Sequence, residues 1–173
     1  MVSLHYPGVV GIDPSLTGTG IAYIDGTTTV VHTKMTRDWR LLAIANAIAT
    51  AVEDEPLLAV LEDLPTHAHG AGKTGMVQGV VRLALLEHRI DYVTVTPATL
   101  KKFATGSGNA KKGDLRMELY KRVGIDLADD NEVDAWWLRA LGHHLVDDPI
   151  VDLPKTHTAA LAKVTVPDLA RRP

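Results

Sequence analysis

The chain has 173 residues, a net charge of -3 and no cysteine. This length fits one domain with its own core, and the missing cysteines exclude disulfides and thiolate metal sites. No apolar stretch is long enough to span a bilayer and the first residues lack a signal-peptide pattern, so we expect a cytoplasmic protein that does not act at membranes. The charge argues against a uniformly basic nucleic-acid binder but leaves local basic patches open.

Three short apolar segments open the chain, separated by Gly-rich and Asp-Gly turns. They predict a meander of three strands at 8–13, 20–25 and 28–33. Apolar residues at helical spacing follow over 40–55, and Pro56 ends this stretch. The first third of the chain is therefore expected to be three strands and one helix.

The rest of the chain alternates strands with helices. A continuous apolar run at 57–63 is typical of a strand buried on both faces, and 91–96 predicts a fifth strand. Helices are predicted at 75–89, 113–124 and 131–145. We expect one domain over 1–146, followed by a C-terminal extension, 147–173, that is loosely attached.

The order of these elements determines the sheet. A meander followed by right-handed helical crossovers gives an α/β fold with a five-stranded mixed sheet in the order 3-2-1-4-5, flanked by helices. The first and fourth strands then lie side by side, and Asp13 and Glu62 stand at their carboxyl ends, where open α/β sheets bind ligands. Two adjacent carboxylates raise each other's pKa unless a cation lies between them. We therefore expect a metal site.

The last predicted helix adds further ligands. Asn131 and Asp134 are three residues apart and share one face of this helix, while Asp129 and Asp130 precede them as caps or as extra charge. Oxygen donors from separate elements suit Mg2+ or Mn2+ better than zinc. Two such ions can activate a water molecule and stabilise the leaving oxygen of a phosphodiester. The acids therefore indicate cleavage of a phosphate bond.

Four motifs in combination resemble the RuvC-type Holliday junction resolvases of the RNase H-like superfamily: GIDPSLTGTG, LED, GNAKKGDLR and NEVDAWWLRA. The resemblance covers residues 8–145. It implies a bacterial or phage-encoded endonuclease of DNA recombination and repair, with Asp13, Glu62 and Asp134 as metal-binding catalytic carboxylates. It also implies a homodimer that cuts two strands of a four-way junction symmetrically.

One position departs from the family pattern. Asn131 stands where the family has a second Asp or a His. Its carbonyl oxygen can bind a metal, so we keep it among the catalytic and metal-binding residues, but it brings no charge and cannot act as a base. Two hypotheses follow. Either Asp130 supplies the missing charge, or Mn2+ supports activity better than Mg2+.

Basic residues cluster in the Gly-rich segment after the fifth strand, where backbone amides and lysines can approach DNA phosphates. The expected DNA-binding residues are Lys101, Lys102, Lys111, Lys112 and Arg116, together with Lys73 from a loop that follows Glu62. The resemblance implies that Lys101 and Lys112 hold the DNA backbone near the metals. Lys112 is also a candidate for stabilising charge in the transition state. A solvated loop is the alternative for this segment.

The predicted helix 75–89 resembles the dimer helix of the family. Its candidate contacts are Met76, Val80, Leu83 and Leu86. Packing of the same stripe into the core of one chain explains the pattern equally well.

Two other functions stay open. GIDPSLTGTG also resembles the first phosphate loop of actin-like ATPases and sugar kinases, although those proteins need a duplicated domain that this chain is too short to hold. Asn131 leaves a junction-binding protein without cleavage activity as the other alternative.

Overall fold

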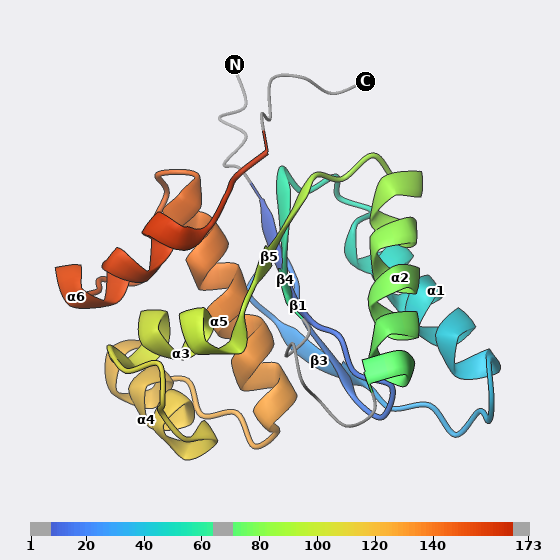
Figure 1. Cartoon of the computed structure of the whole chain (residues 1–173), viewed down its shortest axis with the longest axis horizontal. Helices are drawn as coiled ribbons and strands as arrows, with labels where there is room; N and C mark the ends of the chain where they lie inside the picture. Colours follow the sequence, from blue (N-terminus) through green and yellow to red (C-terminus); the bar gives the residue numbers. More distant parts are fainter. Residues whose placement is uncertain (1–7, 64–70, 168–173) are drawn as a thin grey trace.

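A five-stranded sheet stands between two layers of helices in the computed structural model, which describes residues 8–63 and 71–167 (Figure 1). The strands lie in the order β3-β2-β1-β4-β5, which confirms the predicted sheet. Their bounds are β1 (Val9–Asp13), β2 (Thr19–Ala22), β3 (Thr28–Val31), β4 (Leu58–Glu62) and β5 (Tyr92–Val95). β1 pairs antiparallel with β2 and parallel with β4, so it is the centre of the mixed sheet.

The helices divide between the two faces of the sheet (Figure 1). One face is covered by α1 (Trp39–Ala51) and α2 (Ala71–Glu87). Against the other face lies α5 (Asp130–Leu145), with α3 (Pro97–Thr105), α4 (Lys112–Val123), α6 (Lys155–Thr158) and the 3-10 helix η1 (Ala159–Lys163) on the same side. None of the helices within the described ranges is long and apolar enough to cross a membrane.

The two faces of the sheet bury separate apolar clusters. Along β1, Val9 packs into the cluster under α5, whereas Val10 and Ile12 pack into the cluster under α1 and α2. Both faces of β1 and most of β4 are therefore buried, which explains why the two central strands are continuously apolar in sequence.

Helix α5 lies directly on the backbone of β1 and β2 because glycines face it. A Cβ atom at Gly11 would overlap the Ala135 carbonyl oxygen, and one at Gly20 would overlap the carbonyl oxygen of Asn131. Any side chain at these two positions would push the helix away from the sheet. The glycines therefore determine how closely the first turns of α5 approach the end of β1.

Helix α3 was not predicted, since its segment was assigned to a basic loop. The side chain of Thr96 caps it by accepting a hydrogen bond from the Thr99 N–H at 3.2 Å, and Pro97 follows in the first turn. Gly106, with a φ of 82°, ends the helix in the left-handed conformation. These three signals mark a helix of nine residues where glycines and lysines suggested a loop.

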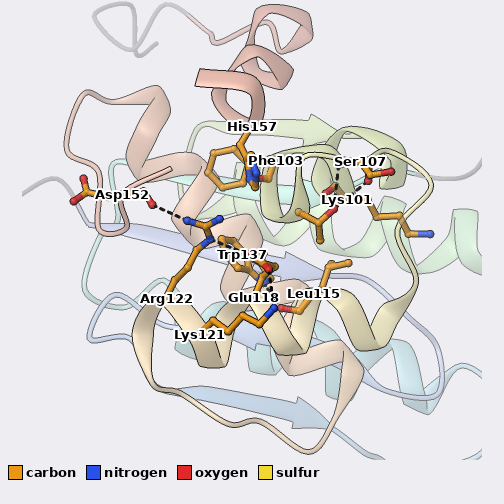
Figure 2. A network of polar contacts seen from close by, with 11 residues as sticks. Lys101, Phe103, Ser107, Leu115, Glu118, Lys121, Arg122, Trp137, Asp152 and His157 are labelled. Atoms are coloured by element: carbon orange, nitrogen blue, oxygen red, sulfur yellow. Dashed lines mark hydrogen bonds and ion pairs between the residues drawn. The ribbon is translucent and has the colours of Figure 1, made fainter. Parts of the chain in front are cut away.

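Residues 147–167 are packed onto the rest of the protein, which differs from the loose extension expected. His157 is buried, and its Nδ1–H donates to the Phe103 carbonyl oxygen of α3 at 3.0 Å (Figure 2). Val151 and Ala160 are buried in the cluster under α5. The boundary between a domain over 1–146 and an extension stays a prediction.

We predict that Gly11→Ala lowers the free energy of unfolding by about 3 kcal/mol or more, because the new methyl group meets helix backbone rather than a movable side chain. Urea denaturation followed by circular dichroism measures the change. Gly79→Ala in α2 is the matched control: a Cβ there meets nothing within 4 Å. This control is expected to stabilise by about 0.5–1 kcal/mol. Similar effects from both substitutions would contradict the role given to Gly11.

Candidate active site

One cavity, of about 300 Å³, lies where β1 and β4 end and α5 begins. Its lining includes all four predicted metal-binding residues and two of the predicted basic residues: Asp13, Glu62, Asn131, Asp134, Lys101 and Lys112. The structure therefore brings together side chains from five separate helices and strands that are far apart in sequence.

The sheet register makes Asp13 and Glu62 neighbours. β1 and β4 run parallel with Ile12 opposite Leu61, so the next residue of each strand is an acid. Asp134 comes from α5, whose close approach over the glycines brings its second turn to the same edge. The topology thus collects three carboxylates at one end of the sheet.

Asp13 is buried and Glu62 and Asp134 are half-buried, and their charges are only partly neutralised. Burial, reinforced by the charge of Asp13, raises the pKa of Asp134 to about 7. Burial likewise raises the pKa of Glu62, and the charges of Asp13 and Asp134 add to this rise. The pKa of Asp13 is raised by burial, while its hydrogen bond with Glu62 opposes the rise. The same hydrogen bond raises the pKa of Glu62 while it lowers that of Asp13. The positive charges of Lys112 and Lys101 counteract the rise at Asp134 without cancelling it.

A divalent cation fits this cavity by charge and by donor type. Carboxylate and amide oxygens are the ligands that Mg2+ and Mn2+ prefer, and a cation would offset the burial and the mutual repulsion that raise the pKa values of Glu62 and Asp134. Within residues 8–63 and 71–167, no three His, Asp or Glu side chains are already arranged to hold an ion. The residues that could hold such an ion are Asp13, Glu62, Asn131 and Asp134, which line the same cavity.

Asn131 is oriented by the residue that caps α5. Asp129 Oδ1 accepts hydrogen bonds from the backbone N–H and the side-chain Nδ2 of Asn131, each at 2.8 Å. Because the amide nitrogen is used in this way, Oδ1 is the atom that Asn131 can offer to a cation. Asp130 pairs with Lys112 instead, with 3.7 Å between Oδ2 and Nζ.

The remaining predicted DNA-binding residues lie outside this cavity. Lys102 lines a second cavity, of about 450 Å³, against another face of α3, together with Lys163 of the C-terminal segment. Lys111 lines a third cavity, of about 390 Å³, beside α4. The structure therefore groups Lys101 and Lys112 with the acids and places Lys102 and Lys111 in separate cavities beside α3 and α4.

Two further basic residues are held differently from the prediction. Arg116 donates from Nε to Asp126 Oδ1 at 2.7 Å, so its charge is already paired. Lys73 is exposed in the first turn of α2, which begins at Ala71 rather than at residue 75. We expected it in the loop that follows Glu62, and residues 64–70 of that segment lie outside the described part of the chain.

Sequence reasoning missed the apolar wall of the cavity. Leu100 of α3 and Leu115 of α4 line it beside the charged residues. The buried Trp137 of α5 donates from Nε1 to the Leu115 carbonyl oxygen at 3.1 Å, which holds α4 against α5 (Figure 2). This bond also fixes the start of α4, and with it Lys112. The only sequence signal was the helical spacing of apolar residues in α3 and α4.

Fold and site together define a class of protein. A mixed five-stranded sheet brings carboxylates to the ends of its two central strands, and the helix across the sheet adds a third, as in an RNase H-like nuclease. Comparison with known proteins identifies the family within this class. The family model described as crossover junction endodeoxyribonuclease RuvC matches residues 9–132. The chain belongs to this family and is a DNA-cleaving hydrolase, which excludes the alternative of an ATPase or sugar kinase.

Individual relatives agree with this assignment. The crossover junction endodeoxyribonuclease RuvC of Chlamydia muridarum is 31% identical over 166 residues, which cover 86% of this chain and 96% of the relative. The protein of the same description from Chlamydia trachomatis serovar L2 is 37% identical over 116 residues, or 63% of this chain and 67% of that one.

Two solved structures share the fold. Thermus thermophilus RuvC superposes with a TM-score of 0.63 at 19% identity, covering 83% of this chain and 99% of that one. The T. thermophilus RuvC in complex with Holliday junction substrate gives a TM-score of 0.66 at 18% identity, over 85% of this chain and 100% of that one. At these identities the superposition establishes the fold.

We predict that the metal-free protein loses stability as the pH rises. For Asp134 the loss falls in the pH range between its ordinary pKa of 3.8 and its raised pKa of about 7. Within it the folded state binds more protons than the unfolded state, so deprotonation favours unfolding by a few kcal/mol in total. Melting temperatures at about pH 5 and pH 8 measure the loss, and added Mg2+ is expected to reverse it at the higher pH.

Asp134→Asn should flatten this profile, since it removes one half-buried charge. Asp54→Asn changes an exposed acid after α1 and serves as the control with an unchanged profile. A wild-type protein whose metal-free stability did not fall with pH would contradict the electrostatics of the cavity.

Proposed function

We propose that the protein hydrolyses phosphodiester bonds at four-way DNA junctions, with Asp13, Glu62 and Asp134 as ligands of two Mg2+ or Mn2+ ions. The observation that carries this proposal is that three acids, one buried and two half-buried, share one cavity with two lysines. Two findings on other proteins support the substrate. The matched family is described as a crossover junction endodeoxyribonuclease, and T. thermophilus RuvC has been solved with a Holliday junction.

The acids take different roles by position. The charge of Asp13 acts on both Glu62 and Asp134, so Asp13 would hold metal together with each of these two acids. When bound, the ions supply an activated water molecule and stabilise the leaving oxygen. Lys112 and Lys101 lie in the same cavity, where their charges hold the DNA backbone against the acids. Lys112 also stabilises the charge that develops on the phosphate.

Asn131 completes the ligand set as a neutral oxygen donor. Its amide nitrogen is bonded to Asp129, and it lines the cavity. Asp130 interacts with Lys112 instead, which supports Asn131 rather than Asp130 as the ligand. One ion is therefore held by less negative charge than an aspartate would provide. We expect weaker binding of Mg2+ and better activity with Mn2+.

The exposed lysines extend the DNA path away from the cavity. Lys102 in α3, Lys111 directly before α4 and Lys73 at the start of α2 are all exposed. Each lysine can neutralise one phosphate and so adds affinity without sequence preference. Arg116 contributes less, because Asp126 already pairs with it.

The exposed face of α2 supports a homodimer. Met76, Leu83 and Leu86 have 47%, 55% and 61% of their surface exposed, and they recur at helical spacing. Large apolar side chains grouped on one helix face favour a covering partner. A four-way junction needs two symmetric cuts, so a second copy related by a two-fold axis is the partner that matches the substrate.

Asp13→Asn, Glu62→Gln and Asp134→Asn are each expected to lower the cleavage rate of a synthetic four-way junction on the order of a thousandfold. Junction binding, measured by fluorescence anisotropy, should persist, because the lysines remain. The matched controls Asp54→Asn and Glu53→Gln change exposed acids after α1 and should cleave normally. A linear duplex tests selectivity for the junction.

Two outcomes would change this conclusion. Normal cleavage by Asp13→Asn would show that the metal centre lies elsewhere. Tight binding without cleavage by the wild-type protein, in Mg2+ and in Mn2+, would favour the junction-binding alternative that Asn131 suggests.

Asn131→Asp is expected to lower the Mg2+ concentration for half-maximal cleavage by about tenfold and to reduce the preference for Mn2+. The added carboxylate supplies the charge that the amide lacks. Cleavage rates across titrations of both metals measure the change. Asp130→Ala is the comparison and should leave the metal dependence unchanged; a higher Mg2+ requirement in this variant would instead assign the charge to Asp130.

A further inference from the structure

The sheet offers no donor to the backbone carbonyl of Glu62. The Asp63 N–H donates to the Val95 carbonyl of β5 at 2.8 Å, so the Glu62 carbonyl, on the opposite side of the same peptide plane, faces β1. In a parallel ladder of this register, its donor would be the N–H of residue 14. That residue is Pro14, which has no N–H.

Gln78 of α2 supplies the missing donor. It is 4% exposed, and its Nε2 donates to the Glu62 carbonyl oxygen. Arg82, one helical turn further along α2, donates from Nε to Gln78 Oε1 at 3.2 Å. Because arginine can only donate, this second bond fixes the amide of Gln78 with its nitrogen towards Glu62.

Arg82 is held in turn from two sides. Its Nη2 lies 3.5 Å from Asp63 Oδ1, and its guanidinium lies over the ring of Tyr92, 5.9 Å from the ring centre. Tyr92 of β5 and Asp63 therefore hold Arg82, Arg82 holds Gln78, and Gln78 bonds to the backbone of Glu62.

We propose that Gln78 is a positioning residue of the metal centre. By bonding to the Glu62 carbonyl it fixes the end of β4, and thereby the direction in which the Glu62 carboxylate meets Asp13. A partly buried carbonyl without a donor is costly, so loss of the amide would make the end of β4 shift to find another partner. The inference rests on the proposed function of Glu62 as a metal ligand.

The test compares the wild-type protein with Gln78→Met, which keeps the length of the side chain but has no donor. Calorimetric titration gives the dissociation constant for Mn2+, and junction cleavage gives kcat and KM. We expect Gln78→Met to bind Mn2+ about tenfold more weakly and to lower kcat by a similar factor, with KM for the junction unchanged. The unchanged KM separates positioning of the metal ligand from loss of DNA binding.

Val81→Ala is the control for stability alone. Val81 is fully buried on the same helix, so its truncation destabilises α2, but the affinity for Mn2+ should be retained. Arg82→Met keeps Gln78 and leaves its amide able to rotate, so an intermediate Mn2+ affinity is expected. This variant also provides the test if Gln78→Met does not fold.

Equal Mn2+ affinity in the wild type and Gln78→Met would overturn the proposal. An equal loss of affinity in Val81→Ala would overturn it too, because the effect would then follow global stability. Failure of the proposed function is recognised separately: Glu62→Gln would then keep Mn2+ affinity and cleavage, whatever Gln78→Met does.

Discussion

The site depends on backbone contact between helix α5 and the two strands beneath it. At Gly11 and Gly20 the strands have no side chains, so the helix backbone lies against the strand backbone. This contact brings Asp134 close enough to Asp13 for one charge to raise the pKa of the other acid. With larger residues at these positions the sheet could still form, but the third carboxylate would move away from the first two.

Assembly of the acids opposes folding, and the rest of the protein compensates for it. Apolar clusters on both faces of the sheet supply the stabilisation, while the cavity holds carboxylates whose pKa values are raised by burial. Lys112 relieves only part of the repulsion, since it also pairs with Asp130. The remaining negative charge can bind a divalent cation. The same group of carboxylates therefore lowers the stability of the metal-free protein and provides its affinity for metal.

Sequence patterns predicted the parts of the structure that depend on periodicity and topology. The strand order followed from the succession of elements, and the neighbouring positions of Asp13 and Glu62 followed from that order. Helix α3 was missed although Thr96 and Gly106 mark its ends, because lysines and glycines nearby favoured a loop. The packing of the C-terminal segment could not be predicted, since it depends on the bond from His157 to a backbone carbonyl of α3, which leaves no local pattern.

Pro14 connects the opening of the cavity with the network behind it. A proline directly after Asp13 ends the hydrogen-bond ladder of β1, and Pro14 itself lines the cavity. The same proline deprives the Glu62 carbonyl of its donor on the neighbouring strand. A residue outside the sheet must then restore that bond, and Gln78 reaches it from the helix layer on the opposite face from α5. The geometry of Glu62 thus depends on α2, whereas that of Asp134 depends on α5, so both layers of the fold contribute to one centre.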